Sequence, residues 1–378
     1  MRRLAVCLGL VLFALPAAAG DKRYPEAKSG GGELKYVNGI PVAVLAGSPE
    51  EIGKQFGELV LKPAKGPLVG RVDSYMAKVG WGDQFPGMVK FAGRLFTMFP
   101  EPNQKEMLTA AKTADVDVRL LSALNLIPDL AKLGGCSTLI VEPARSSTAG
   151  PLFGRNLDWP PHENLPEFTL VVVYKPTGKH AVAAVTFPVI LGVLSGMNDA
   201  GLCLTINEIT ASKDGSKKQD PFGVPVMYLY RKILEECTTL DEAEKMLKAH
   251  KRTTYFCLTA CDAKGGCVFE VTPDNVVRRS GENAVCCCTN HFRTDELSVT
   301  KKCSRYPKLE AVQKADGKLG VGEVYKALDT VKQGPATVQA MVFEPATRSL
   351  HLSYGSDSKS ATEKPLSKVE LSDIFRRK

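Results

Sequence analysis

Hydrophobic residues recur at helical spacing through the part of the chain that precedes Cys136. The stretch Ser48-Pro49-Glu50-Glu51 supplies an N-cap, a proline at the first helical position and an acidic third residue. One hydrophobic face then follows, made by Ile52, Phe56, Leu59 and Val60. Further amphipathic helices are predicted over residues 88–99, 105–112 and 118–132. Residues 34–135 are therefore expected to form a mainly helical segment.

From Cys136 onward the pattern changes to short β-rich runs bounded by turn residues. We predict strands within residues 136–142, 150–157, 168–176, 180–191, 201–209, 253–262, 265–272 and 284–292, and a hairpin over residues 336–355. Helices are predicted over residues 226–237, from Thr239 with Glu242 as its capping-box partner, and over residues 304–314 and 322–332. This order predicts an α+β fold in which two mostly antiparallel sheets are sandwiched between helical layers.

The two ends of the chain lack such patterns. Residues 1–19 carry two arginines, a short apolar run and a small-residue site, which together indicate a signal peptide. We favour this interpretation over a membrane anchor because a spanning helix needs ~20 apolar residues, and no later run is long enough either. Residues 20–33 are polar and glycine-rich and are expected to form a flexible leader, and residues 356–378 a loosely held polar tail.

The composition indicates a soluble globular protein, with 44% hydrophobic and 24% charged residues in a chain of 378. The formal charge of +8 falls to +6 when Arg2 and Arg3 leave with the signal peptide. Basic and acidic residues are interspersed, and no Arg-rich block alternates with aromatic residues. A nucleic-acid partner is therefore not expected.

Cysteine usage permits disulfides in an oxidising compartment but does not fix their pairing. The chain has 11 cysteines, of which Cys7 belongs to the signal segment. It has no Cys-x-x-Cys pair, and its 5 histidines are scattered. A structural zinc site is therefore not expected.

Cys136 is the candidate nucleophile, although a cysteine at the start of a strand is usually a small buried apolar residue. Gly134 and Gly135 give the backbone before it the freedom that a thiol needs to reach the carbonyl of its own preceding peptide bond. Arg155 and Asp158 are predicted on the tight turn of a hairpin that returns close to Cys136. No histidine stands in a recognisable Cys-His motif, so a papain-like arrangement has no evident base.

A cysteine without a histidine can be activated by its own α-amine once that amine is free. The reference pKa of an α-amine is about 7.7 to 8.0, so the group is partly neutral near physiological pH. Cleavage before Cys136 would create this base, which is the logic of an N-terminal nucleophile (Ntn) hydrolase. Such a site needs no metal and no organic cofactor.

The motifs GGCSTL, GRNLDW, GMNDAGLCLTINE, CTNHF and CSRY occur in this order, after a segment GSPEEIGKQFGELV and a stretch DVDVRLLSALNLIPDL. In these motifs the chain resembles the autoproteolytic penicillin acyltransferase family (peptidase family C45), which is related to choloylglycine hydrolases and acid ceramidases. The resemblance extends from about residue 48 to residue 355. It implies an Ntn-hydrolase sandwich of four layers, αββα, with a catalytic domain over residues 136–355 and a pro-segment or small chain over residues 34–135.

The resemblance also implies roles for residues on either side of the predicted first turn. Cys136 matches the nucleophile, and the Gly135-Cys136 bond matches the self-cleavage point. Arg155 matches the arginine beside the thiol, where a cation favours the thiolate. Asp158 matches the carboxylate that accepts a hydrogen bond from the α-amine. As an alternative, Arg155 and Asp158 form an exposed turn ion pair worth about 0 to 1 kcal/mol.

Three more polar residues match the family's site further along the chain. Asn207 and Asn290 match groups that hold the oxyanion, and Arg305 matches a distal arginine that braces the site. As alternatives, the two asparagines cap strand ends and Arg305 is a residue on a helix surface. The common order and spacing of all these residues favour the functional interpretation.

These matches imply a secreted or periplasmic enzyme that cuts itself before Cys136 and keeps its cleaved N-terminal segment as a partner. It would then cleave a small linear amide, or transfer its acyl group, through a Cys136 thioester. Two alternatives stay open: a non-catalytic envelope protein that keeps the fold as a binding or structural module, and a choloylglycine-type hydrolase. The long segment before Cys136 disfavours the latter, because an internal cysteine must be released by cleavage.

Overall fold

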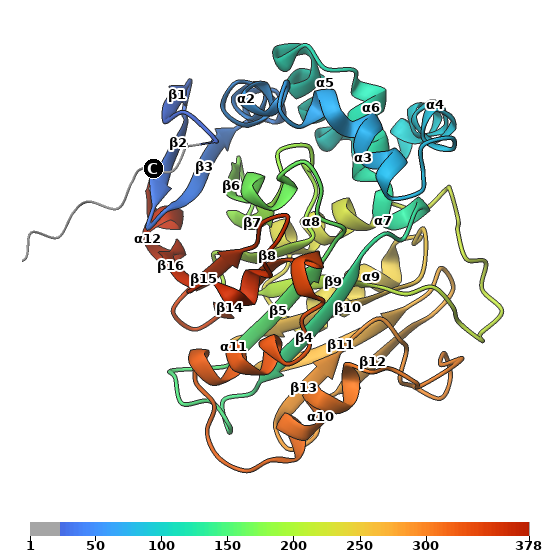
Figure 1. Cartoon of the computed structure of the whole chain (residues 1–378), viewed down its shortest axis with the longest axis vertical. Coiled ribbons are helices and arrows are strands. Elements are labelled where there is room, and N and C mark those ends of the chain that lie inside the picture. The colour runs from blue at the N-terminus through green and yellow to red at the C-terminus, as the bar shows by residue number, and fades with distance from the viewer. Residues whose placement is uncertain (1–22, 378) are drawn as a thin grey trace, which may run out of the picture.

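The structure is a computed structural model that describes residues 23–377, so the predicted signal peptide lies outside the described residues. Within this range the strands form two sheets, and helices cover the outer face of each (Figure 1). We call the ten-stranded sheet sheet A and the six-stranded sheet sheet B. Cys136 lies in sheet B, near the start of its strand.

Sheet A combines segments from both sides of Cys136. Its strands, in spatial order, are β1 (Ala27–Ser29), β2 (Gly32–Val37), β3 (Ile40–Gly47), β6 (Leu170–Pro176), β7 (Val182–Thr186), β8 (Ser195–Asn198), β9 (Cys203–Glu208), β10 (Phe256–Asp262), β11 (Gly265–Val271) and β12 (Val276–Ser280). Strands β3 and β6 pair in parallel, and the other neighbours in the described sheet are antiparallel. The segment before Cys136 is thus built into the same sheet as the segment after it.

Sheet B is antiparallel throughout its described strands. Its spatial order is β13 (Val285–Cys288), β4 (Gly135–Val141), β5 (Leu152–Asp158), β14 (Thr337–Glu344), β15 (Ser349–Tyr354) and β16 (Ser367–Glu370). The α-helices are α1 (Pro49–Phe56), α2 (Lys62–Ala64), α3 (Val72–Lys78), α4 (Phe85–Leu95), α5 (Glu101–Ala114), α6 (Val118–Asn125), α7 (Ile127–Leu130), α8 (Val226–Glu236), α9 (Leu240–Ala249), α10 (Tyr306–Lys314), α11 (Val321–Asp329) and α12 (Leu371–Arg376).

Successive side chains along each strand point to opposite faces of the sheet and pack into different hydrophobic cores, which defines four layers. In β6, Leu170 and Val172 pack into the apolar core that contains α1, α5 and α8, whereas Val171 packs into the core between the sheets. In β4, Ile140 lies in that same intersheet core, whereas Leu139 packs against α10 and α11 on the other face. The layer order is helices, sheet A, sheet B, helices, which confirms the predicted αββα sandwich.

The predicted flexible leader is wrong within the described residues, and the segment predicted to be mainly helical begins with strands, of which β3 ends at Gly47, before its helices. Strands β1 and β2 form an antiparallel pair, and Gly30, with φ of 53°, makes the turn between them. Tyr24 is buried, and its hydroxyl donates a hydrogen bond to the carbonyl of Phe168 at 2.8 Å. The glycine-rich sequence is therefore the turn of a hairpin, whose backbone groups are satisfied by strand pairing.

The prediction of a loosely held C-terminal tail is also wrong. Strand β16 pairs with β15, and the helix α12 that follows buries Leu371 and Ile374 in the intersheet core. Ser353 Oγ also donates a hydrogen bond to the carbonyl of Ala361 at 2.8 Å. These elements escape the pattern because each is only one helical turn or a few residues long.

Each cysteine among residues 23–377 is a free thiol, and most are buried within or between the sheets. Within the part of the chain that the structure describes, the fold therefore contains none of the disulfides that the sequence permitted. Burial raises the pKa of the Cys286 thiol from its ordinary 9.0 to about 11, although Arg279 lowers it. Deprotonation of such a thiol is opposed by the fold.

We expect the free energy of unfolding to fall between pH 9 and 11 less steeply in Cys286→Ala than in the wild type. The folded chain holds the Cys286 proton more tightly than the unfolded chain, so this stabilisation is complete below pH 9 and is lost as the pH rises through about 11. The rise of the Cys286 pKa from 9.0 to about 11 corresponds to about 3 kcal/mol. Urea unfolding at fixed pH values measures both slopes, and equal slopes would contradict the expectation.

Candidate active site

The hairpin of β4 and β5 brings the first three predicted site residues together. Its register pairs Gly135 with Asp158 and Thr138 with Arg155. Arg155 and Asp158 lie within a strand and not on the predicted turn, because β5 continues through Asp158. The expectation that the hairpin returns them to Cys136 is confirmed.

The thiol of Cys136 lies against a buried cation. Arg155 Nη2 donates a hydrogen bond to Cys136 Sγ at 3.3 Å, and both residues are buried. Arg155 Nη1 donates to the carbonyl of Ile206, which fixes the guanidinium in place. Burial raises the pKa of the Cys136 thiol to about 11, and Arg155 opposes that increase without cancelling it. In the uncut chain the thiol is therefore neutral at pH 7 and needs a base.

The backbone of Cys136 is held on both sides. Its N–H donates a hydrogen bond to Asn290 Oδ1 at 2.8 Å, and its carbonyl accepts one from Arg305 Nη1 at 2.7 Å. Arg305 Nη2 also donates to Asn290 Oδ1, at 2.7 Å. Arg305 is thus in direct contact with the candidate nucleophile residue, and not distal as predicted. The atom of Asn290 that contacts Cys136 is its side-chain oxygen, not its N–H group, and it contacts the nitrogen that cleavage would turn into the α-amine.

Asp158 lies beside the predicted scissile bond. Its carboxylate accepts hydrogen bonds from Thr337 Oγ1 at 2.6 Å and from Arg305 Nη1 at 3.1 Å. Burial raises the pKa of Asp158, while Thr337 and Arg305 oppose the increase. A Cβ added to Gly135 would lie 3.2 Å from Asp158 Cβ. Gly135 has no positive φ. The glycine is therefore explained by space for the carboxylate more than by backbone freedom.

Asn207 presents an unused donor. It is fully buried on β9, and its Oδ1 accepts a hydrogen bond from Thr259 Oγ1 at 3.2 Å. Thr259 in turn lies 3.2 Å from the hydroxyl of Thr138 on β4. Asn207 Nδ2 meets no acceptor in the described part of the chain. A buried N–H group without an acceptor is costly, so its position suits a developing negative charge.

Sequence reasoning missed Glu208. Strand alternation puts Glu208 on the face opposite to Asn207, yet its Oε2 accepts a hydrogen bond from the Gly134 N–H at 2.8 Å, directly before the predicted scissile bond. Burial raises the pKa of Glu208, and Lys132 foremost opposes this. The available signal was a glutamate at the end of a strand predicted from its β-rich pattern, next to the candidate Asn207, because carboxylates are almost never fully buried unless they are paired.

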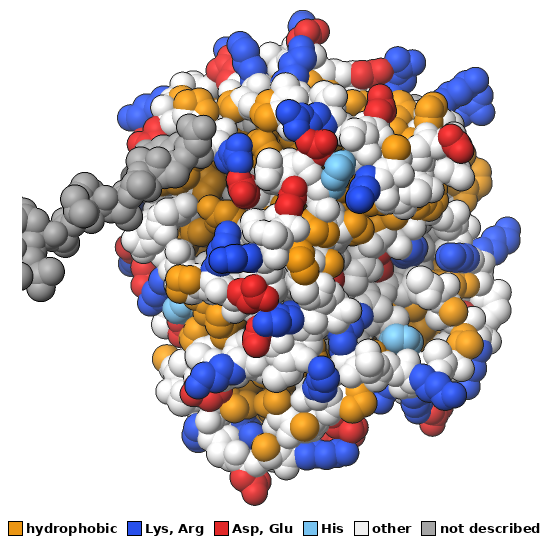
Figure 2. All heavy atoms as spheres, viewed as in Figure 1, with side chains coloured by type: hydrophobic (Ala, Val, Ile, Leu, Met, Phe, Trp, Pro, Cys, Tyr) orange, Lys and Arg blue, Asp and Glu red, His pale blue; other side chains and the backbone are white. Residues whose placement is uncertain are grey.

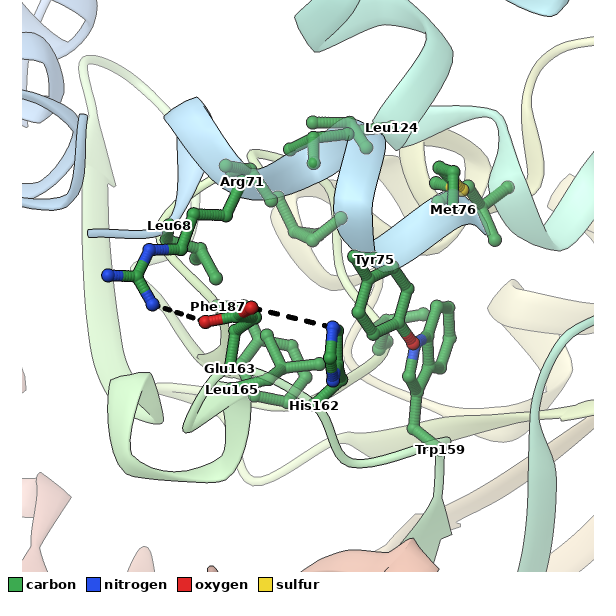
Figure 3. Close-up of a pocket in the computed structure, with 15 residues that line it drawn as sticks. Leu68, Arg71, Tyr75, Met76, Leu124, Trp159, His162, Glu163, Leu165 and Phe187 are labelled. Carbon is green, nitrogen blue, oxygen red and sulfur yellow. Dashed lines mark hydrogen bonds and ion pairs between the residues drawn. The ribbon is translucent and has the colours of Figure 1, made fainter. Parts of the chain in front are cut away.

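An apolar cavity of about 60 Å³ begins at Trp159, the residue after Asp158. Its walls come from both sides of the predicted scissile bond, as Figure 3 shows: from before it Leu68, Val72, Tyr75, Met76, Leu124 and Ile127, and from after it Trp159, Leu165, Phe187, Val189, Ile190 and Leu194. At one side an ion pair joins Arg71 to Glu163, and His162 Nε2 lies 3.5 Å from Glu163 Oε1 (Figure 3). The cavity can hold a slender apolar group, and Trp159, the chain neighbour of Asp158, links its lining to the polar site.

The surface gives two further observations. On the face drawn in Figure 2, basic and acidic side chains are interspersed, with hydrophobic side chains between them. Among residues 23–377, no helix combines the length and the apolar character that a membrane crossing requires.

Comparison with known proteins yields matches in one group of enzymes. A family model described as acyl-coenzyme A:6-aminopenicillanic acid acyl-transferase matches residues 145–358, a range that begins after Cys136 and contains the other five predicted site residues. Acid ceramidase of Rattus norvegicus is 25% identical over 198 residues, which span 46% of this chain and 48% of the relative, or about half of the relative's length.

Two solved structures are also similar. One is the Caenorhabditis elegans ortholog of N-acylethanolamine-hydrolyzing acid amidase, with a TM-score of 0.40 and 21% identity, covering 56% of this chain and 93% of that chain. The other is penicillin V acylase from Agrobacterium tumefaciens, with a TM-score of 0.46 and 15% identity, covering 62% of this chain and 86% of that chain.

Proposed function

The chain belongs to the acyl-coenzyme A:6-aminopenicillanic acid acyl-transferase family of Ntn hydrolases, and on that premise we propose that it is an exported, self-cleaving amidase or acyltransferase. Cleavage falls between Gly135 and Cys136, and Cys136 then attacks amides of apolar acyl groups. The observation that carries the proposal is that three side chains hold Cys136 by hydrogen bonds. Arg155 binds its sulfur, Asn290 binds its backbone nitrogen, and Arg305 binds its carbonyl oxygen.

Self-cleavage begins when Cys136 Sγ attacks the carbonyl carbon of Gly135 and its proton passes to a nearby base. The Gly135–Cys136 C–N bond then breaks, the nitrogen takes up a proton, and a thioester joins Gly135 to Sγ. Water hydrolyses this thioester to a Gly135 carboxylate and a free thiol. Glu208 fixes the preceding peptide through the Gly134 N–H, so the attacked carbonyl is held close to the thiol.

Amide turnover uses the same sulfur with a new base. The freed α-amine takes the thiol proton, and Sγ attacks the substrate carbonyl while Asn207 Nδ2 donates to the oxyanion. The α-amine then returns the proton to the leaving amine as the C–N bond breaks. Asn290 Oδ1, which accepts from this nitrogen before cleavage, keeps the α-amine oriented. Water resolves the thioester in a hydrolase, and an acceptor amine resolves it in an acyltransferase.

The cavity at Trp159 supports a substrate whose acyl chain is apolar. Its lining is aliphatic and aromatic apart from the Arg71, His162 and Glu163 group, and it begins one residue from Asp158. Similarity to acid ceramidase, a relative named for a lipid amide, points to the same substrate class. We therefore propose linear N-acyl amines as substrates.

We expect kcat/KM of the wild type to rise with acyl length from acetyl to butanoyl in a series of N-acyl anilides, and to level off for longer chains, because the cavity has a volume of only about 60 Å³. Each buried CH₂ contributes about 0.8 kcal/mol, or roughly fourfold. Ile190→Trp should fill the cavity and lower kcat/KM at least tenfold for the butanoyl substrate while changing the acetyl value less than about twofold. Val299→Trp, at an exposed position, is the matched control. A series without length dependence would overturn the assignment of the acyl chain to this cavity.

A further inference from the structure

A second cavity, of about 170 Å³, lies under the loop of residues 219–225. It shares no lining residue with the cavity at Trp159. One wall is apolar and comes from α4, with Phe91 and Leu95, and from the two ends of α7, with Leu126 just before the helix and Leu130 as its last residue. Figure 1 shows α4, α6 and α7 at the upper right of the molecule. Nothing in the proposed reaction uses this space.

The polar part of the wall is acidic. Asp129 and Asp220 line the cavity, and the lining residues include no lysine or arginine. Asp129 is only 3% exposed. Its Oδ1 accepts hydrogen bonds from Thr253 Oγ1 and from the N–H of Val226, the latter at 3.0 Å. Its Oδ2 has no hydrogen-bond partner within residues 23–377.

The charge of Asp129 is not balanced by a direct ion pair. Lys132, three residues on, sends its ammonium to the carbonyl of Tyr255 at 2.7 Å. Burial raises the pKa of Asp129 to about 6, and Thr253, the Val226 N–H and Lys132 oppose the increase. A buried carboxylate that lacks a direct ion pair is stabilised by a cation that can donate a hydrogen bond to its free oxygen.

The loop of residues 219–225 forms the rim of the cavity and is held in place by hydrogen bonds and prolines. Gln219 Nε2 donates hydrogen bonds to the carbonyls of Asp129 and Leu130, at 3.1 and 3.2 Å. Pro221 and Pro225 restrict the backbone on either side of Gly223. Phe91, on the opposite wall, is 41% exposed, so the apolar wall reaches the surface. The space is thus bordered by an apolar surface, a fixed loop and a buried acidic group.

We propose that this cavity is a binding site for an organic amine, whose ammonium donates to Asp129 and whose apolar substituent packs against Phe91, Leu95 and Leu126. Two carboxylates without a lining cation select positive charge, and the apolar wall selects a carbon chain over an inorganic ion. The site stands independently of the proposed amidase function, since it uses neither Cys136 nor the Trp159 cavity.

The experiment is calorimetric titration of the wild-type protein with hexylamine, and with 1-hexanol as its neutral counterpart. We expect hexylamine to bind at least tenfold more tightly than 1-hexanol. Asp129→Asn, which keeps an oxygen for Thr253 and Val226, should weaken hexylamine binding at least tenfold. Phe91→Ala, at a partly exposed position that should not disturb folding, should weaken it at least threefold.

Ile190→Trp, which fills the other cavity, is the matched control and should leave hexylamine binding unchanged. Equal binding of hexylamine and 1-hexanol would overturn the proposal. So would binding that survives both Asp129→Asn and Phe91→Ala, or binding that Ile190→Trp abolishes. If Asp129→Asn does not fold, the Phe91→Ala variant and the comparison of hexylamine with 1-hexanol are sufficient to test the proposal.

Discussion

Cys136→Ala is expected to remain one continuous chain without amidase activity, whereas the wild type separates into two pieces on a denaturing gel. The reason is that Sγ of Cys136 is the attacking atom in both reactions of the proposed mechanism, and alanine offers no substitute. Intact mass spectrometry and N-terminal sequencing of the larger piece should give a chain that begins at Cys136. Cys237→Ala, another buried cysteine that lies at the end of α8, is the matched control and should be cleaved like the wild type.

A wild-type chain that is continuous across residues 135 and 136 and still hydrolyses amides would contradict the mechanism. A continuous chain that is also unreactive to a thiol probe would favour the envelope binding module instead. After cleavage the two pieces should co-elute on gel filtration without denaturant. Strand β3 pairs with β6, and the helices before Cys136 fill one face of sheet A, so the pieces share one core.

Asp158→Asn is expected to lower kcat/KM of the cleaved enzyme by about 10² to 10⁴. Asparagine keeps an oxygen for the Thr337 hydroxyl but removes the negative charge that faces Arg305 and the region of the future α-amine. Without that charge the protonated α-amine loses stabilisation as the thiol proton is transferred. Steady-state assays on the two-piece variant, with a thermal unfolding check, measure the effect.

Asp241→Asn is the matched control, because Asp241 forms an exposed ion pair with Arg278. We expect it to change kcat/KM less than about twofold. An Asp158→Asn enzyme with wild-type turnover would exclude Asp158 from the reaction. If this variant is not cleaved, the loss of cleavage is itself the measured effect. If it is cleaved at the normal rate and turnover is lost, Asp158 acts in turnover and not in cleavage.

The sequence by itself determined many of the local elements and the candidate site residues of the hairpin that contains Cys136. Helix α9 begins at its capping box of Thr239 and Glu242 as predicted, because that signal is complete within four residues. The hairpin of β14 and β15 and the strand β5 behind Cys136 followed from alternation alone. The motif residues Cys136, Arg155 and Asp158 needed only one hairpin to meet.

Only the tertiary structure decided which distant segments share a sheet and what each polar group touches. The pairing of β3 with β6 joins residues separated by more than a hundred positions, and no local period encodes it. The contacts of Arg305 with Cys136 and of Glu208 with Gly134 likewise depend on loops and strand ends meeting in space. The spacing of hydrophobic residues indicates which face of a helix or strand is buried. Which other segment packs or pairs with that face is fixed only by the packing of the whole chain.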